Sequence, residues 1–355
     1  MKILHISNFG DKHNGRLYWN QCYKISNGFI RNGHNVYNFS ERDKSRSDLL
    51  NKFNKNKKLQ SSILETVKNY HPDVVLLGHA DRIHLETLEQ IRSVNPNIKI
   101  AEWNVDNYLL DNTEHKLKSR SRYLDGIFST TADSKLSECL SDNFITFFPN
   151  IVDLTIEKLK IFKNPEHNKE IFFALSHGVG TGKLRKKNTN KEINDPRVIF
   201  AKEIIAADIE VKCNFFGFND ISPVWAEEFN NEINSCYMGL CLQRKPQLKY
   251  CLSDRIAQYG GNGLMLFIER DTQFNEFLID NEEAVFFEGI DDLLEKIHYF
   301  KKNKVKSLKI AEAGYNKLHA YCNEKAVTNY FLDCLFSENL KNLKTKYGWP
   351  IHFYK

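Results

Sequence analysis

Short apolar runs alternate with longer amphipathic stretches along most of the chain. Residues 2–7, 74–77 and 171–175 are runs of the kind that forms buried strands. Residues 85–94 and 196–207 instead carry apolar side chains at helical spacing. Strands that alternate with helices in this way predict parallel sheets with helices on both faces. We therefore expect an α/β fold.

The alternation falls into two series, because the pattern relaxes into a charged segment over residues 150–168. At 355 residues the chain is long enough for two domains that each bury a core. We expect two tandem Rossmann-like, doubly wound domains facing a cleft, over residues 1–165 and 166–335, followed by a tail over residues 336–355. This layout suits an enzyme that brings a nucleotide-bearing donor to an acceptor. It would equally suit a periplasmic binding protein, but the N-terminus has the pattern of a strand and not of an export signal.

Composition narrows the class of protein further. The hydrophobic content of 41% and the charged content of 27% are those of an ordinary globular protein. The net charge of +5 is modest and the lysines are spread along the whole chain, so we expect no nucleic-acid partner. A mildly basic protein suits phosphorylated ligands or an anionic membrane surface. No apolar run reaches the length of a membrane span, so we expect a cytoplasmic protein, with peripheral contact with the inner membrane surface as a further option.

The eight cysteines show no sign of a metal centre or a disulfide framework. No two of them have CxxC spacing, and no histidine lies at a zinc-ligand interval from one. Several fall within apolar strands or helices, where a reduced cysteine behaves as a small hydrophobic residue. We therefore expect a reducing compartment, no bound metal and no other cofactor.

The stretch over residues 235–269 carries the densest group of charged candidates. It comprises a strand, a polar insert, a short helix, a Gly-Gly-Asn-Gly turn and a second strand. Parallel sheets bind ligands at the carboxyl ends of their strands, so Lys249 and Arg255 are candidates to offset the charge of a leaving nucleotide diphosphate. Asp254 could contact the ligand or only cap the helix. Gly261 could give backbone contact with a ligand or only a tight reversal.

Two other strands of the second domain end in candidate donor contacts. The strand at residues 171–175 enters a glycine-rich basic loop that is similar to a phosphate cradle, although no Walker A frame fits and a solvated basic loop is the alternative. The candidates in this loop are Ser176, His177, Gly178 and Lys183. After a later strand, Phe216 beside Gly217 could stack on a base. Phe215 and Phe216 point to opposite faces, so one of them belongs to the core.

Three polar clusters follow successive strands of the first domain. Asp11 and His13 lie in the first loop, where either could deprotonate an acceptor hydroxyl or serve only as a cap or loop residue. The candidate acceptor contacts after the next strands are His79, Asp81, Trp103 and Asp106. Trp103 could be a platform on which a sugar stacks, or a core residue. Three such clusters at three strand ends are a stronger signal together than any one alone.

Several segments resemble a known family. They are KYCLSDRIAQYGGNGLMLF at residues 249–267, NEEAVFFEGIDDLLEKIHYF at residues 281–300 and LKIAEAGYNKL at residues 308–318. In the first domain, LLGHADRIHLETLEQIRSVNPNIKIAEWNVD at residues 76–106 looks like the corresponding part. The chain resembles GT-B glycosyltransferases of the CgeB-like kind, which are related to the group 1 glycosyl transferases. The resemblance covers most of the chain and is weaker at its start.

The resemblance implies a hexosyltransferase-type glycosyltransferase that acts without a metal. It would move a sugar from a nucleotide-sugar donor, held by the second domain, to a glycan, lipopolysaccharide or other glycolipid or glycoconjugate acceptor at the first domain. Lys249 and Arg255 would face the diphosphate, and the tail would return toward the first domain. Gln258 stands where relatives often carry a glutamate that holds the donor ribose, and its amide can still bind a hydroxyl. The alternative is a non-catalytic nucleotide-sugar-binding or assembly protein of the same fold.

Overall fold

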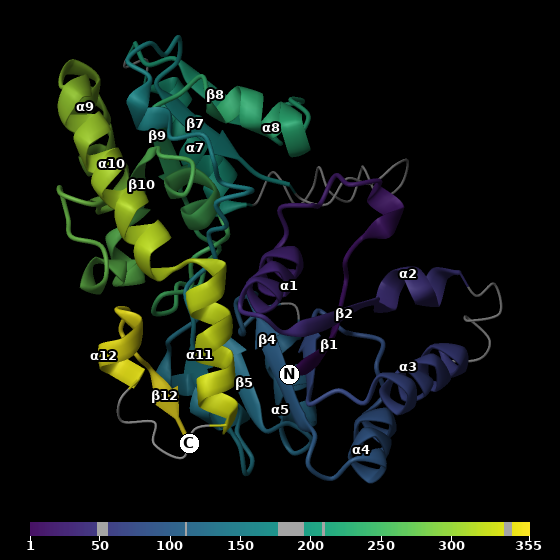
Figure 1. The fold of residues 1–355 in the computed structure, drawn as a ribbon. Coiled ribbons are helices and arrows are strands. Elements are labelled where there is room, and N and C mark those ends of the chain that lie inside the picture. The colour runs from purple at the N-terminus through teal and green to yellow at the C-terminus, as the bar shows by residue number, and fades with distance from the viewer. Residues whose placement is uncertain (48–55, 111, 177–194, 208–209, 337–342) are drawn as a thin grey trace. The chain divides into compact units, whose positions relative to one another are not determined.

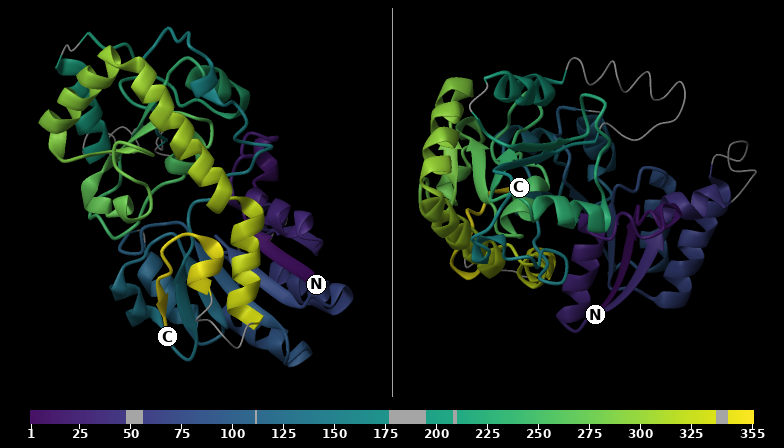
Figure 2. Two further views of the ribbon diagram at one scale, coloured as in Figure 1. Left: turned by 60° about the vertical axis from the view of Figure 1, so that its left-hand side comes forward. Right: turned by 90° about the horizontal axis from the view of Figure 1, so that it is seen from above.

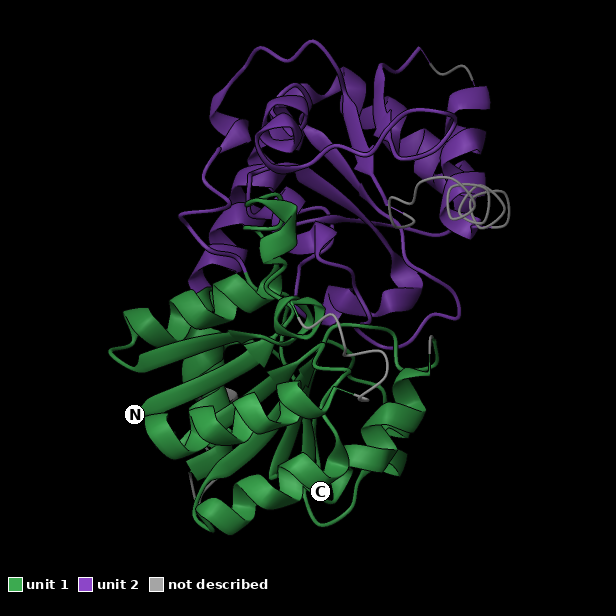
Figure 3. Ribbon diagram, turned by 90° about the vertical axis from the view of Figure 1, so that its right-hand side faces the viewer, with its two compact units in different colours: residues 1–151, 321–355 green, residues 152–320 purple. Residues whose placement is uncertain are grey.

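The computed structural model describes the chain except for residues 48–55, 111, 177–194, 208–209 and 337–342. The described residues form two compact units, one of residues 1–151 with 321–355 and one of residues 152–320 (Figure 3). The chain therefore divides after residues 151 and 320, whereas the sequence pattern suggests divisions after residues 165 and 335. The difference at the second division arises because the last long helix packs within the first unit.

The first unit is built on a mostly parallel sheet, called here the N-terminal sheet. Its strands are β1 (Lys2–Ser7), β2 (Asn35–Ser40), β3 (Val74–Gly78), β4 (Lys99–Asn104), β5 (Gly126–Ser129), β6 (Phe144–Phe147) and β12 (Phe353–Tyr354). Their order is β12-β6-β5-β4-β3-β1-β2, and every neighbouring pair is parallel except β12 with β6. β12 comes from the tail and lies at the sheet edge (yellow in Figure 2).

Helices connect and cover these strands (Figure 1). They are α1 (Gln21–Arg31), α2 (Glu41–Arg46), α3 (Lys57–Tyr70), α4 (Leu85–Val94), α5 (Thr113–Ser121), α11 (Glu324–Phe336) and α12 (Leu343–Tyr347), with the short turns η1 (Asp11–His13) and η2 (Ser134–Cys139). α1 packs along α11, and Arg31 of α1 pairs with Glu324 of α11 at 2.6 Å. Gly28 permits the close approach, because a Cβ atom there would overlap the backbone carbonyl of Glu324.

The second unit is built on a parallel sheet, called here the C-terminal sheet. Its strands are β7 (Ile171–Ala174), β8 (Cys213–Phe216), β9 (Met238–Cys241), β10 (Met265–Glu269) and β11 (Val285–Phe287), in the order β11-β10-β9-β7-β8. Its helices are α7 (Pro196–Ala206), α8 (Ala226–Ile233), α9 (Gly289–Lys302), α10 (Lys304–Tyr321), the π-helix η4 (Ile256–Gly260) and the 3-10 turns η3 (Ile161–Lys163), η5 (Arg270–Thr272) and η6 (Phe274–Glu276).

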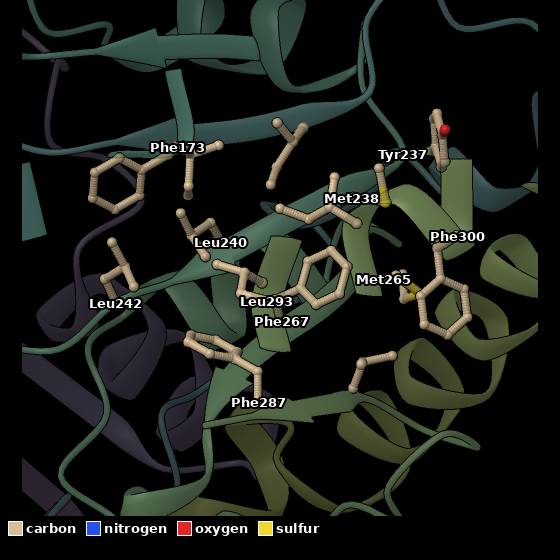
Figure 4. Packing of buried hydrophobic residues seen from close by; sticks show 14 of the residues in the cluster. Phe173, Tyr237, Met238, Leu240, Leu242, Met265, Phe267, Phe287, Leu293 and Phe300 are labelled. Atoms are coloured by element: carbon tan, nitrogen blue, oxygen red, sulfur yellow. The ribbon is translucent and has the colours of Figure 1, made fainter. Parts of the chain in front are cut away.

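The core of the second unit joins the strands of the C-terminal sheet to α7, α9 and α10 (Figure 4). Leu240 of β9 and Phe267 of β10 are fully buried, and the ring of Phe300 from α9 packs against that of Phe267 with centroids 6.2 Å apart. Full burial of one such side chain stabilises the fold by about 1.5–3 kcal/mol. The strands are apolar on both faces because helices cover both, which is why the apolar runs identify them in the sequence. The predicted α/β class with parallel, helix-covered sheets is confirmed.

Candidate functional site

Each sheet has a point at which the strand order reverses. In the C-terminal sheet, β8 pairs with β7 on one side and β9 pairs with β7 on the other. In the N-terminal sheet, β2 and β3 flank β1 in the same way. Open parallel sheets bind ligands outside the carboxyl ends of the strands at such a reversal. The candidate regions are therefore the ends of β7 and β9 and the ends of β1 and β3.

Arg255 joins the ends of β7 and β9. Its Nε donates to the carbonyl oxygen of Ala174, the last residue of β7, at 3.0 Å. Its Nη1 donates to the carbonyl oxygen of Leu242, which follows β9, at 3.2 Å. The same nitrogen donates to Ser253 Oγ at 2.8 Å. The guanidinium group therefore lies at the reversal of the C-terminal sheet.

The charge of Arg255 is buried. The residue is 8% exposed, and among the described parts of the chain no carboxylate forms an ion pair with it. Burial lowers the pKa of Arg255, and the charge of Arg197 lowers it further. Arg197 is itself compensated, because its Nε and Nη2 bind the two carboxylate oxygens of Asp195 at 2.9 and 2.6 Å. A buried cation without a carboxylate partner is unfavourable, so this position favours an anionic ligand.

Buried hydrogen bonds hold the elements around Arg255. Gln243 follows β9 and is 4% exposed, and its side-chain oxygen accepts from the backbone N–H of Ser253 at 2.9 Å. Tyr259 is fully buried in η4, and its hydroxyl accepts from the backbone N–H of Ala174 at 3.0 Å. The sequence reasoning missed both residues. A polar residue directly after an apolar strand is the signal that could have identified Gln243.

Gln258 and Asp254 lie on the same helical segment as Arg255. Gln258 is 9% exposed, and its side-chain amide forms no hydrogen bond with any residue that the structure describes. Its backbone N–H donates to the carbonyl oxygen of Asp254 at 2.9 Å, which places Asp254 in the first turn. Asp254 is partly exposed. A buried amide without a described partner is a candidate to bind a ligand hydroxyl.

The end of β8 contributes an aromatic ring and a glycine. Phe216, the last residue of the strand, is partly exposed, whereas Phe215 is 6% exposed and belongs to the core. The prediction that one of these two phenylalanines is a core residue is confirmed. Gly217 has a φ of +91°, and a Cβ atom there would overlap the carbonyl oxygen of Leu175. Glycine is required because the exits of β7 and β8 approach closely.

Of the remaining donor candidates, Ser176 and Lys249 lie in the part of the chain that the structure describes. Ser176 is exposed directly after β7, whereas His177, Gly178 and Lys183 lie outside the described residues, and their roles stay predictions. Lys249 pairs with Glu276 at 2.8 Å. The Tyr250 hydroxyl donates to the same carboxylate at 2.6 Å. Contact between Lys249 and a diphosphate would require this ion pair to open, so that role also stays a prediction.

The structure corrects the interpretation of Gly261 as a donor contact. The turn that contains it leads into the first residue of β10, Met265, so it lies at the amino edge of the C-terminal sheet. The candidate site lies at the opposite, carboxyl edge. A Cβ atom at Gly261 would overlap the carbonyl oxygen of Ala257, and the carbonyl oxygen of Gly261 accepts from His319 Nε2 at 2.8 Å. Gly261 is therefore a packing residue.

An opening of about 590 Å³ adjoins the carboxyl ends of β10 and β11. Its lining includes Lys245, which pairs with Glu269 at 3.0 Å and with Asp271 at 2.8 Å. It also includes Arg270 and the N-terminus of α9. Burial raises the pKa of Glu269, while Lys245 opposes the shift. The volume falls within the usual range for small-molecule sites.

In the first unit, Asp11 and His13 lie in η1, directly after β1. Asp11 is exposed, and its backbone N–H donates to Asp43 Oδ2 at 2.9 Å. Asp11, Asp43 and Lys44 line an opening of about 320 Å³ beside the end of β2. Burial lowers the pKa of His13, and Lys12 lowers it further, so the ring is neutral at neutral pH. A neutral imidazole or an ionised carboxylate could accept a proton here.

The acceptor candidates after β3 and β4 fall into two groups of side-chain contacts. His79 Nδ1 lies 3.5 Å from Asp106 Oδ2, so the structure brings these two residues together. Asp81 instead pairs with Lys116 at 2.5 Å and with Arg42. Burial alone would raise the pKa of Asp81, but Lys116 and Arg42 lower it overall. Asp81 is therefore ionised and already compensated by two cations.

Trp103 is a core residue, and the interpretation of it as a sugar-stacking platform is wrong. Its side chain is 1% exposed, and its Nε1 donates to His5 Nε2 at 3.0 Å. The ring lies where a Cβ atom of Gly78, on the neighbouring strand, would be. Both faces of the ring are enclosed by the protein, so a sugar cannot reach them in this conformation.

Glu41 is a further candidate that the sequence reasoning missed. It opens α2 directly after β2 and is 0% exposed. Burial raises the pKa of Glu41 to about 7, and Arg42, whose Nε lies 3.6 Å away, opposes this shift. A carboxyl group with a pKa near neutrality is suited to acid–base chemistry, although a buried structural carboxyl group titrates in the same way. No local pattern in the sequence marks it.

Two further observations concern all the described residues and not the candidate site alone. Among the described residues, no group of three or more histidine, cysteine, aspartate or glutamate side chains is placed to hold a metal ion. Within the same part of the chain, no helix is both long enough and apolar enough to cross a membrane.

The fold is that of the GT-B glycosyltransferases. HepE from Anabaena in complex with UDP matches with a TM-score of 0.55 and 11% identity, over 95% of this chain and 100% of that chain. Sucrose-phosphate synthase from Thermosynechococcus elongatus matches with a TM-score of 0.56 and 12% identity, over 94% and 98%. The lipopolysaccharide outer core galactosyltransferase WaaB matches with a TM-score of 0.52 and 12% identity, over 96% and 100%. Identities of this size establish the fold alone.

Sequence comparison adds a similarity over part of the chain. Residues 198–333 match the family model described as glycosyl transferase-like, and this segment covers most of the second unit from α7 onward. No curated protein sequence matches the chain. The expected resemblance to group 1-related GT-B proteins is confirmed, and so is the glycosyltransferase class.

Proposed function

We propose that the protein transfers a sugar from a nucleotide-activated donor to a glycan, lipopolysaccharide or other glycoconjugate. The observation that carries this proposal is Arg255, a buried cation without a described carboxylate partner at the reversal of the C-terminal sheet. The diphosphate of a nucleotide sugar is the anion that such a position in a GT-B fold suits. The solved complex of HepE with UDP shows that a protein of this fold binds a nucleoside diphosphate.

The donor would occupy the carboxyl edge of the C-terminal sheet. Arg255 would bind the diphosphate, and the side-chain amide of Gln258, which has no partner among the described residues, would bind a ribose hydroxyl. The partly exposed ring of Phe216 would stack on the base. In the reaction, the acceptor oxygen forms a bond to the anomeric carbon while the bond from that carbon to the diphosphate breaks. The guanidinium group stabilises the negative charge that develops on the diphosphate, so no metal is needed for this purpose.

The acceptor would lie at the carboxyl edge of the N-terminal sheet. Asp11, exposed beside an opening, or the neutral ring of His13 would take the proton that the acceptor hydroxyl loses. His79 and Asp106 would bind acceptor hydroxyl groups. We place the protein in the cytoplasm, in peripheral contact with the membrane where its acceptor is a glycolipid.

A panel of nucleotide sugars tests the proposal. Each is incubated with the protein, and release of the nucleoside diphosphate and ligand-induced thermal stabilisation are both measured, because stabilisation reports binding to the folded state. Arg255→Gln should abolish donor binding and turnover. Arg255→Lys should keep part of the binding, because it retains the positive charge. It should not keep all of it, because a lysine cannot donate to the carbonyl oxygens of Ala174 and Leu242 as the guanidinium group does.

Arg92→Gln is the matched control, since Arg92 is a partly exposed arginine of the first unit paired with Asp125 at 2.7 Å. It should leave binding and turnover unchanged. Full turnover by Arg255→Gln would show that the donor does not bind at Arg255. Asp11→Asn should abolish transfer and preserve donor binding, and unchanged transfer would exclude Asp11 as the base.

A second function, nucleotide-sugar binding without catalysis, is favoured by two observations. Lys249 is already compensated by Glu276, and Gln258 occupies a position where relatives often carry a glutamate. A weakened set of charges could bind a donor without promoting its cleavage. The same panel separates the two functions, because this one predicts stabilisation by a nucleotide sugar with no release of the diphosphate under any acceptor condition.

A further inference from the structure

The corner between α9 and α10 concentrates positive charge. Residues 299–309, called here the lysine corner, contain no acidic residue and hold Lys301, Lys302, Lys304, Lys306 and Lys309. The net charge of the whole chain is +5, so the rest of the chain is neutral overall. The lysine corner therefore carries a local positive charge as large as the net charge of the whole chain.

Among the described residues, no carboxylate forms an ion pair with a lysine of this corner, although Glu170 and Glu166 lie near enough to Lys304 to oppose the lowering of its pKa by burial. Lys304 Nζ donates to the carbonyl oxygen of Pro165 at 2.7 Å, and Lys306 Nζ donates to the Tyr299 hydroxyl at 3.3 Å. These partners are neutral. Lys302 and Lys309 are exposed, and neither forms a hydrogen bond or ion pair with a residue that the structure describes. The ammonium groups are therefore available to an external anionic surface.

Apolar side chains stand among these lysines. Val305 is 71% exposed, the highest value among the large apolar side chains of the described residues. Tyr299, on the last turns of α9, is 46% exposed. A cluster of exposed lysines alone would suit any polyanion, but an aliphatic side chain at the tip of a helix corner gains nothing from contact with phosphate groups. It gains by entering an apolar layer.

The lysine corner lies at the amino edge of the C-terminal sheet. α9 follows β11 and returns along the sheet, so its end and the start of α10 are at the edge where the strands begin (Figure 1). The hydrogen bond of Lys304 to Pro165 and that of Lys301 to the carbonyl oxygen of Glu210 confirm this, because both acceptors precede strands. The candidate donor site is at the other edge, so a surface bound at the corner leaves it uncovered.

We propose that the lysine corner docks the second unit onto a membrane surface rich in anionic lipid. The lysines would lie among the anionic headgroups, and Val305 and Tyr299 would enter the interface between headgroups and acyl chains. Each lysine near such a surface strengthens binding by about fivefold. Apolar insertion supplies the second signal that stable peripheral binding needs. This proposal gives a location to the membrane contact proposed above. It does not depend on catalysis, so the membrane docking and the sugar transfer can be disproved separately.

The test is cosedimentation of the full-length protein with vesicles of phosphatidylcholine, with and without phosphatidylglycerol. The triple variant Lys302→Gln, Lys306→Gln, Lys309→Gln should bind anionic vesicles more weakly by roughly one to two orders of magnitude. The matched control is Lys57→Gln, Lys58→Gln, Lys68→Gln, which removes three exposed lysines from α3 of the first unit. This control should bind within about twofold of the unsubstituted protein. Val305→Ser should weaken binding severalfold.

Raised salt should release the unsubstituted protein from anionic vesicles, because exposed charges are screened. Equal losses for the two triple variants would overturn the proposal, since the effect would then follow net charge alone. Equal binding to vesicles with and without phosphatidylglycerol would overturn it as well. If Val305→Ser has no effect and duplex DNA binds in a way that needs the corner lysines, the corner is a nucleic-acid surface instead.

Discussion

Glu41 illustrates how one buried side chain can couple stability to pH. Its carboxyl group is 0% exposed, and burial raises its pKa to about 7 from an ordinary value of 4.5. In the window between these values the folded protein holds a proton that the unfolded chain releases. The free energy of unfolding therefore falls as the pH rises through this window, by at most about 3 kcal/mol.

Glu41→Gln should remove most of this dependence, because the amide is neutral at every pH. Urea unfolding near pH 5 and near pH 8 measures it. The unsubstituted protein should lose more stability between the two conditions than Glu41→Gln does. Glu65→Gln, at an exposed position of α3, is the control and should behave like the unsubstituted protein. The same pH dependence in all three proteins would show that Glu41 does not titrate in this range.

Trp103 shows where prediction fails at the scale of one residue. The sequence correctly places it at the end of a buried strand, β4, but a residue there can point into the core or toward a ligand. The decision depends on Gly78, which pairs with Trp103 across β3 and β4 and leaves the space that the indole ring fills. It also depends on His5, which accepts the indole N–H. Neither neighbour is close in sequence, so no local pattern could reveal the burial.

Trp103→Ala should destabilise the protein by about 3–5 kcal/mol, because it leaves a cavity beside Gly78. Trp103→Phe keeps an aromatic ring but leaves His5 without its donor, and should cost about 1–3 kcal/mol. Tyr37→Ala, at a side chain that is 47% exposed, is the control and should have a small effect. Urea unfolding compares the three. If Trp103→Ala were instead stable and had lost acceptor binding, the interpretation of Trp103 as a sugar-stacking platform would be supported.

At the scale of elements, the strands and most helices are predictable because the sheets are buried on both faces. An apolar run then marks a strand whichever face its residues occupy. The side at which a connection lies is also predictable, since a turn between a helix and the next parallel strand lies at the amino edge of the sheet. This rule already places Gly261 away from the ligand edge. Pairing between loops, such as Lys249 with Glu276, depends on contacts that element patterns do not contain.

The contact between α1 and α11 gives a prediction for Gly28→Ala. The added methyl group would overlap the backbone carbonyl of Glu324, so one helix must move. Such overpacking costs about 1–3 kcal/mol, which exceeds the gain of up to about 1 kcal/mol from the better helix propensity of alanine. Ser93→Ala, on the exposed face of α4, is the control and should be nearly neutral. A more stable Gly28→Ala variant would show that α11 does not pack closely on α1.

At the scale of the whole molecule, the sequence pattern predicts two α/β units but not how the chain divides between them. The last long helix lies far along the chain from α1, and its packing on α1, with the close approach at Gly28 and the Arg31–Glu324 pair, assigns it to the first unit. The resemblance to GT-B proteins follows from motifs, and solved structures at 11–12% identity confirm the fold. A fold shared at this level does not specify a donor sugar or an acceptor, because those depend on site residues that vary among proteins of one fold.

Amide hydrogen exchange over the whole chain can locate the donor site without knowledge of the sugar. Saturating UDP, or another nucleoside diphosphate that stabilises the protein, should slow exchange at residues 171–176 and 241–260, which surround Arg255. At a concentration of about one hundred times Kd, opening reactions that release the ligand should slow by up to roughly a hundredfold. Arg255→Gln should abolish this protection, and Arg92→Gln should retain it. Protection confined to residues 269–271 and 287–289 would move the nucleotide to the opening beside β10 and β11. Protection confined to the first unit would show that the nucleotide does not bind at the C-terminal sheet.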